Sequence, residues 1–212
     1  MKILKNKIFL LFFFLLTALL LSISYQIRSD YSIVTISDTN DSGSPSKSSK
    51  WIIFKSSHFT VYCNPTANLK RIERKLRKRK FYITGLKNSD YSRNIQDKIG
   101  YRLDRLFVRA KQILDMNPRI KKIHLKIFKN RKEVKEEFFK IYRIRRRVKS
   151  FYVYKFNTIF ISEQDITDSV VAHEIGHALT DHYFVVIPPL KVREMLASYV
   201  DLHLEEERIL VE

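Results

Sequence analysis

The spacing of apolar residues after Trp51 changes repeatedly along the chain, and these changes limit the fold class more than any other feature. Apolar and polar side chains alternate over 58–63 and again over 123–128, which predicts strands. Apolar residues recur at helical spacing over 90–116 until Asn117-Pro118, which predicts a long amphipathic helix. The full set is strands over 58–63, 123–128, 148–154 and 158–162, and helices over 65–80, 90–116, 131–142 and, from Asp165 onward, on both sides of 187–189. This order, βααβαββαα, indicates an α+β fold with a small mixed sheet and helices packed on it.

Composition excludes several other classes of protein. A chain of 212 residues has room for one ordinary domain with appendages. Hydrophobic residues make up 45% of it, enough for a core, so wholesale disorder is excluded. The single cysteine, Cys63, excludes an internal disulfide framework and a zinc finger with several cysteine ligands.

The N-terminal segment has the pattern of an export signal. Three lysines precede an apolar run from Ile8 to Ile23, which is slightly short for a membrane span. It is either a signal cleaved near Ser22-Ile23-Ser24 or an uncleaved anchor; a buried core helix fits the flanking residues less well. In both main cases the positive-inside rule places the remaining chain outside the cytoplasm, secreted or membrane-anchored. The predicted organisation is a signal or anchor over 1–27, a flexible linker over 28–50 and one domain over 51–212.

Charge divides the chain into two parts. Residues 1–162 hold 37 Lys/Arg and 11 Asp/Glu, whereas residues 163–212 hold 3 and 11. Basic residues cluster over 70–80 and 143–149, which suits either an anionic lipid surface or another polyanion, or simply solvated helix faces. We expect contact with a membrane surface rather than with nucleic acid.

The acidic part contains the sequence His173-Glu174-Ile175-Gly176-His177, within a segment that has an apolar helical face. Residues four apart lie on one side of a helix, so His173 and His177 can bind the same metal ion. Glu174 is turned away from the first histidine and can accept a proton from a water that zinc activates. Gly176 faces away from the metal and allows a neighbouring element to pack closely. The alternative is an ordinary amphipathic helix with two surface histidines.

A catalytic zinc ion needs a third protein ligand and an open position. The acidic and histidine residues downstream of the motif are candidates for this ligand: Asp181, His182, Glu194, Asp201 and His203. If the next helix folds back after Pro188-Pro189, Glu194 comes to lie beside His177. Asp181 sits one turn beyond His177 and is expected to orient that histidine instead.

The motif together with Arg193-Glu194-Met195-Leu196-Ala197-Ser198-Tyr199 resembles the small exported bacterial zinc peptidases of the gluzincin, peptidase-MA-like type. The resemblance implies a zincin-like domain, one zinc ion bound by His173, His177 and Glu194, and Glu174 as the general base. Met195 departs from the glycine that is common in that pattern. The metzincin pattern fails, because Thr180 and Tyr183 stand where glycine and the third histidine would be.

Two functions follow from these patterns. The first is a zinc metallopeptidase acting on extracytoplasmic proteins or peptides, which would add to the sheet edge of the 148–162 hairpin. Its oxyanion donor is expected to be Tyr199, with His203, Tyr183 and Tyr152 as alternatives. The second is a non-catalytic, membrane-tethered binding or scaffold protein whose metal site is structural or has lost its activity.

Overall fold

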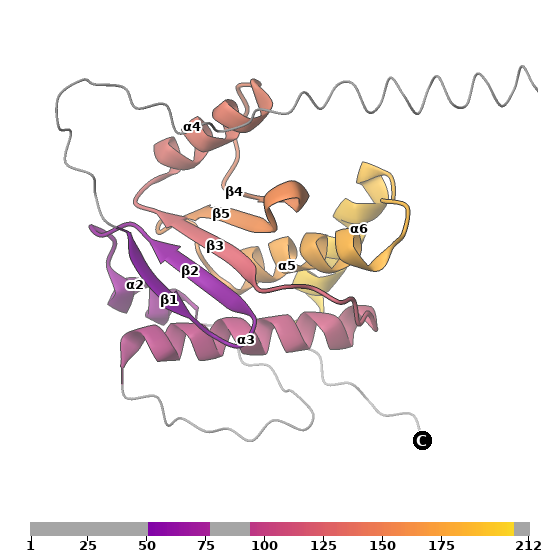
Figure 1. Cartoon of the computed structure of the whole chain (residues 1–212), viewed down its shortest axis with the longest axis horizontal. Helices are drawn as coiled ribbons and strands as arrows, with labels where there is room; N and C mark the ends of the chain where they lie inside the picture. The colour runs from indigo at the N-terminus through magenta and orange to yellow at the C-terminus, as the bar shows by residue number, and fades with distance from the viewer. Residues whose placement is uncertain (1–50, 77–93, 206–212) are drawn as a thin grey trace, which may run out of the picture. The chain divides into compact units, whose positions relative to one another are not determined.

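The computed structural model describes residues 51–76 and 94–205 of the chain (Figure 1). These residues form an α+β fold with a five-stranded mixed sheet and five α-helices. The strands are β1 (Ile52–Lys55), β2 (Phe59–Cys63), β3 (Ile123–Phe128), β4 (Ser150–Val153) and β5 (Thr158–Ser162). The helices are α2 (Leu69–Lys75), α3 (Ile95–Leu114), α4 (Arg131–Tyr142), α5 (Asp168–Tyr183) and α6 (Leu190–Leu202), with a 3-10 turn, η1, over Tyr154–Phe156.

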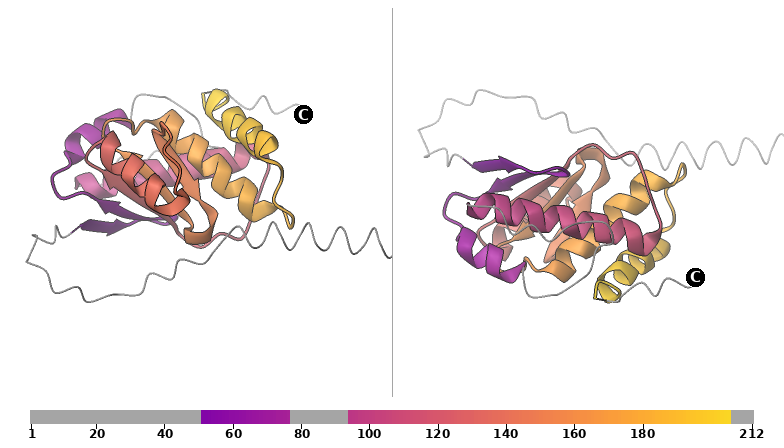
Figure 2. Two further views of the ribbon diagram at one scale, coloured as in Figure 1. Left: turned by 90° about the horizontal axis from the view of Figure 1, so that it is seen from above. Right: turned by 90° about the horizontal axis from the view of Figure 1, so that it is seen from below.

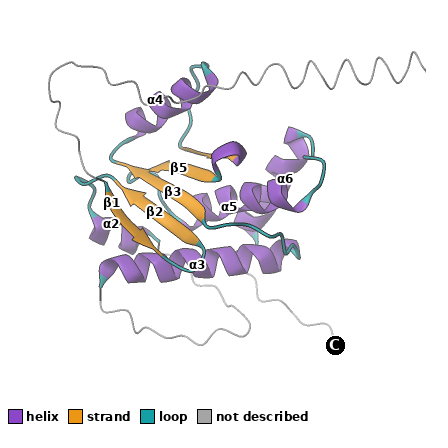
Figure 3. Cartoon of the chain, in the orientation of Figure 1, coloured by secondary structure: helices purple, strands orange, loops and turns teal. Residues whose placement is uncertain are grey.

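The sheet has the order β1-β2-β3-β5-β4. Its three central strands, β2, β3 and β5, run parallel, whereas β1 and β4 pair antiparallel at the two edges (Figure 3). The register places Val61, Leu125 and Ile159 side by side across the parallel strands. Because side chains alternate along a strand, this register sends one row of apolar residues to the same face of the sheet.

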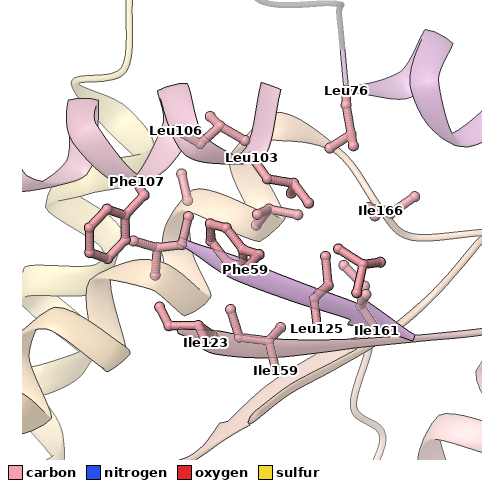
Figure 4. Packing of buried hydrophobic residues seen from close by; sticks show 14 of the residues in the cluster. Phe59, Leu76, Leu103, Leu106, Phe107, Ile123, Leu125, Ile159, Ile161 and Ile166 are labelled. Atoms are coloured by element: carbon pink, nitrogen blue, oxygen red, sulfur yellow. The ribbon is translucent and has the colours of Figure 1, made fainter. Parts of the chain in front are cut away.

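Helices cover both faces of the sheet. Helices α3 and α5 lie against the face formed by the aligned apolar row, and α4 lies against the opposite face (Figure 2). In the larger core, Phe59 and Leu125 of the sheet pack beneath Leu103 and Leu106 of α3, all fully buried (Figure 4). The smaller core joins Phe160 to the buried residues beneath α4.

Side-chain caps fix where four of the helices begin, and Asn68 caps α2 by accepting from Arg71 N at 3.0 Å. Asn94 accepts a hydrogen bond from the Asp97 backbone at 2.8 Å, and Asn130 accepts two from the first turn of α4. The Thr167 side chain accepts one from Val170 N at 3.3 Å and starts α5. Each cap satisfies a backbone donor that the first turn of a helix leaves free.

The predicted α+β class is confirmed, and the helix over 131–142 and the strands over 123–128 and 158–162 have the predicted bounds. One strand was missed: the β1 edge strand pairs with β2 through a tight turn. The basic helix is shorter than predicted, because α2 ends at Lys75; residues 77–80 lie outside the described residues. The predicted signal or anchor and the linker also lie outside them. Among the residues that are described, no helix is long and apolar enough to cross a membrane.

Candidate metal centre

Helix α5 carries both histidines of the motif on one side. Their rings are 4.9 Å apart, centroid to centroid, and meet nearly at right angles. Both side chains are partly accessible to solvent, His173 more than His177. The helix buries its other side in the core through Val171, Ile175 and Leu179. Packing of the apolar side therefore turns the two imidazoles away from the core.

Glu194 of helix α6 faces the two histidines. One of its carboxylate oxygens lies 3.5 Å from His173 Nε2 and the other lies 3.6 Å from His177 Nε2. One ligand atom from each of the three residues lies within 4.8 Å of the others. The structure thus brings together the three residues that the sequence predicted as metal ligands.

Gly176 explains how α6 comes so close to α5. A Cβ atom at this position would lie 2.8 Å from the Cα atom of Ala197 and 3.4 Å from a methyl group of Val200. The missing side chain allows the two helix backbones to touch. Glu194 lies one turn before Ala197 on α6, so this contact sets its distance from the histidines.

The donor set fits a zinc ion. Two imidazole nitrogens and one carboxylate are a known ligand set for catalytic zinc. In tetrahedral zinc sites with bonds of 2.0–2.1 Å, neighbouring ligand atoms are about 3.4 Å apart. The two imidazole-to-carboxylate distances lie close to this value. The Glu194 side chain is 52% exposed, so the solvent side of the cluster is open to a further ligand.

Glu174 is buried where α5 meets the edge strand β4. It is 4% exposed, and its carboxylate accepts a hydrogen bond from Ser150 Oγ at 2.6 Å. Burial raises the pKa of Glu174 to about 7, although hydrogen bonds from Ser150 and from the Tyr152 backbone oppose the shift, and the nearby Glu194 charge adds to it. Ser150 and Tyr152 both belong to the edge strand β4, so the carboxylate is held against that strand.

Burial also lowers the pKa of His177 to about 4, reinforced by the charge of His173 and opposed by that of Glu194. The imidazole is therefore neutral at physiological pH. A neutral imidazole is the form that binds a metal ion.

Asp181 does not have the partner that its sequence position suggested. The prediction was a hydrogen bond to His177, but both Asp181 oxygens lie 3.3 Å from Nη1 of Arg193. This pair joins the end of α5 to the residue just before Glu194. Asp181 therefore supports Glu194 through the backbone of α6 rather than by orienting a histidine.

Tyr199 lies on α6, five residues after Glu194 and about 140° further around the helix. Its ring stacks on His203 at 3.8 Å, and His203 Nδ1 lies 2.8 Å from the Tyr199 carbonyl oxygen. These contacts do not bring the Tyr199 hydroxyl to the ligand cluster. Its assignment as a catalytic donor stays a prediction.

The two other tyrosines named as candidate donors lie elsewhere. The Tyr152 hydroxyl lies 3.1 Å from His182 Nε2 and donates to Asn157 at 3.0 Å. Tyr183 is about half exposed and contacts the ring of Phe184. Within the described part of the chain, His182 and His203 make these contacts with tyrosines and are not part of the three-residue ligand cluster.

Three acidic residues just before the motif hold its helix in place, and their partners were not predicted from the sequence. Asp168 accepts two hydrogen bonds from the guanidinium group of Arg102 of α3, at 2.9 and 3.0 Å. Asp165 pairs with Arg131 of α4, and Glu163 with Lys129 at 3.0 Å. All three acidic side chains are buried, whereas their partners come from α3 and from the segment 129–131.

Comparison with known proteins gave no match: no protein-family model, no curated protein and no solved structure is significantly similar to this chain. The resemblance to gluzincin peptidases therefore stays a prediction from the motif residues. Any function must be argued from the residues and their geometry.

Proposed function

We propose that the chain is a zinc-dependent metallopeptidase with a zincin-like domain. One observation carries the proposal: His173, His177 and Glu194 present their ligand atoms to one point, with Glu174 buried beside them. A structural site would have no use for a carboxylate at this position. A zinc ion bound there would polarise a carbonyl group and lower the pKa of a coordinated water.

The protein residues have separate tasks in this proposal. The two imidazoles and Glu194 would hold the metal ion, and the α5–α6 contact at Gly176 fixes their spacing. Glu174 accepts the proton of the attacking water and later passes it to the leaving amine. The positive charge of a bound zinc ion would keep the Glu174 carboxylate ionised at neutral pH, despite its burial. Ser150 and the Tyr152 backbone hold this carboxylate in one orientation.

The edge strand β4 is the place where we expect a peptide substrate to bind. It pairs with β5 on one side only, so its other side has backbone groups free of sheet pairing. An extended peptide can add to such an edge through main-chain hydrogen bonds. Because β4 also contacts Glu174, a peptide at this edge would lie next to the general base.

The test combines zinc quantification with peptide hydrolysis by the purified chain. We expect one zinc ion per chain, strong loss of zinc in Glu194→Ala, and a much smaller loss in Asp181→Asn, which keeps an oxygen that can accept from Arg193. Glu174→Gln should keep zinc and lose hydrolysis by at least about 10²-fold, because an amide cannot accept the proton.

Two outcomes would contradict the proposal. Hydrolysis by Glu174→Gln at the unmodified rate, or hydrolysis that a chelator does not affect, would exclude this mechanism. Stoichiometric zinc without hydrolysis of any peptide in a broad mixture would favour the alternative of a membrane-tethered binding protein with a structural metal site.

A further inference from the structure

Three segments distant in sequence meet at the end of the domain where α5 stops. The Asn157 side chain donates to the carbonyl oxygens of Lys121 and Lys122, both at 3.2 Å. The ring of Tyr154 lies 4.8 Å from that of His182, near the end of α5. The start of β3, the η1 turn and the α5–α6 connection therefore form one continuous end of the domain (Figures 1 and 2).

This end exposes apolar side chains. Val185 is fully exposed and Val186 is 81% exposed, at the tip of the α5–α6 connection. Six more large hydrophobic side chains of this end are exposed: Tyr154, Phe156, Tyr183, Phe184, Ile187 and Leu190. Single exposed apolar residues are ordinary, but a contiguous group of this size marks a surface that binds something.

The same end is purely basic. The segments 117–122, 153–157 and 182–192 contain no Asp or Glu. Their exposed cationic residues are Arg119, Lys121, Lys122, Lys155 and Lys191. Apolar and aromatic side chains next to lysines are the composition of protein surfaces that lie in the interface of an anionic bilayer.

We propose that this end, which we call the apolar tip, inserts into the headgroup region of an anionic membrane. The aliphatic side chains of Val185 and Val186 would enter the boundary of the acyl chains. The lysines around them would contact lipid phosphates. The lysine-flanked apolar run at the N-terminus of the sequence agrees with this, since it predicts delivery of the domain to a membrane.

Charge argues against a second copy of the chain as the occupant. A symmetric contact through the apolar tip would bring the same five cationic residues of both copies together. Like charges at that distance repel, and no acidic residue of these three segments would offset them. An anionic lipid surface instead gains from each lysine, by roughly 5-fold in binding constant per residue.

The experiment uses the full chain and a fluorescent label at one position. Val185→Cys places the label at the tip, and Lys135→Cys, on exposed α4, is the matched control. The natural Cys63 is fully buried and its pKa is raised to about 12, chiefly by burial, so it does not compete for the label. The N-terminal run brings both variants to vesicles equally, so only their difference reports on the tip.

Vesicles of phosphatidylcholine, with or without phosphatidylglycerol, carry a quencher on the lipid. We expect quenching at Val185→Cys in the anionic vesicles and little at Lys135→Cys. Reversing two tip charges in Val185→Cys, Lys121→Glu with Lys155→Glu, should reduce quenching of the tip label and raise the anionic lipid fraction needed for half-quenching. The same reversal at Lys132 and Lys135 of α4 should have a much smaller effect.

Three results would overturn the proposal. The first is equal quenching at both positions, and the second is quenching at the tip that does not depend on the anionic lipid. The third is a blue shift of the tip label that grows with protein concentration without any lipid, since this would identify a second copy as the occupant. None of these results depends on zinc or on hydrolysis.

Discussion

The two ends of helix α5 adjoin different kinds of surface. At its N-terminal end, Asp168 is buried and accepts two hydrogen bonds from the Arg102 guanidinium group. Asp165 and Glu163, just before the helix, pair with Arg131 at the start of α4 and with Lys129, which lies between β3 and α4. At its C-terminal end, the chain leaves the helix through exposed apolar residues that include Val185.

The paired acids at one end stabilise the fold, whereas the exposed apolar side chains at the other end do not. Buried charges are costly unless they are paired, so the paired acids at the N-terminal end hold one geometry. Since the two histidines of the proposed metal site follow within three turns, this end fixes their position. Exposed apolar side chains contribute little to stability, so their presence at the other end indicates a use outside the folded core.

The largest loss of stability is expected from removing the ion pair between Asp168 and Arg102 at the N-terminal end of α5. Asp168→Ala leaves the Arg102 charge, itself mostly buried, without its carboxylate. Removing one member of a buried pair typically costs about 3–5 kcal/mol, so the free energy of unfolding should fall by that order. Urea denaturation measures it.

The control for this variant is Glu136→Ala, which removes one member of an exposed pair on α4. That change should cost less than about 0.5 kcal/mol. If both variants lose the same small amount, the acid before the motif is not a structural anchor.

The second-largest loss of stability is expected from a substitution at Gly176, in the middle of α5. Gly176→Ala would push a methyl group into the backbone of α6, because Ala197 Cα lies 2.8 Å from the position of the added atom. Overpacking of this kind costs about 1–3 kcal/mol. Since α6 carries Glu194, zinc affinity should also fall, by at least about 10-fold.

Both the free energy of unfolding and the zinc affinity are measured in Gly176→Ala. Together they show whether the helix contact only stabilises the fold or also positions Glu194. Ser198→Ala is the control. Because Ser198 is exposed on α6, its substitution should change neither the free energy of unfolding nor the zinc affinity. Zinc affinity that stays unchanged in Gly176→Ala would mean that the helix contact does not position the third ligand.

The sequence predicted the parts of this arrangement that depend on local pattern. The i,i+4 histidines and the helix that returns after Pro188-Pro189 sufficed to select Glu194, which lies 3.6 Å from His177. The β1 strand was missed because only its pairing with β2 distinguishes four residues from a loop.

Contacts between distant residues could not be predicted in the same way. Ser150 lies 24 residues before Glu174, and Arg102 lies 66 residues before Asp168. Such pairs form because the sheet register and the helix packing bring them together, and one sequence does not reveal either. Asp181 shows the resulting error, since its helical neighbour His177 was the expected partner and Arg193 is the real one.

A third, smaller effect concerns pH at the N-terminal end. Burial alone would raise the pKa of Asp165, but hydrogen bonds from Arg131 and Ser162 outweigh it and hold the pKa below the ordinary value of an aspartate. A lowered folded pKa gives stability that is present above the unfolded value and is lost as pH falls through the folded value. We expect Asp165→Asn to cost about 1–2 kcal/mol at neutral pH.

The decisive measurement for Asp165 is the free energy of unfolding as a function of pH. The difference between Asp165→Asn and the unmodified chain should shrink as the pH falls below about 4, because the unmodified carboxyl group then becomes protonated too. A difference that is constant from neutral to acidic pH would show that the charge of Asp165 does not contribute.

The smallest effect is expected at the apolar tip, and it provides the sharpest contrast with the other end of the helix. Val185→Ser replaces a fully exposed side chain, so the free energy of unfolding should change by less than about 0.5 kcal/mol. The matched control is the same substitution at Val171, which is fully buried near the start of α5; it should cost about 2–4 kcal/mol, because it removes apolar contacts and buries a hydroxyl group. Urea denaturation of both variants, without lipid, makes the comparison. If Val185→Ser destabilises the fold as much as Val171→Ser does, the connection is packed against the domain and its apolar residues are not free to meet a membrane.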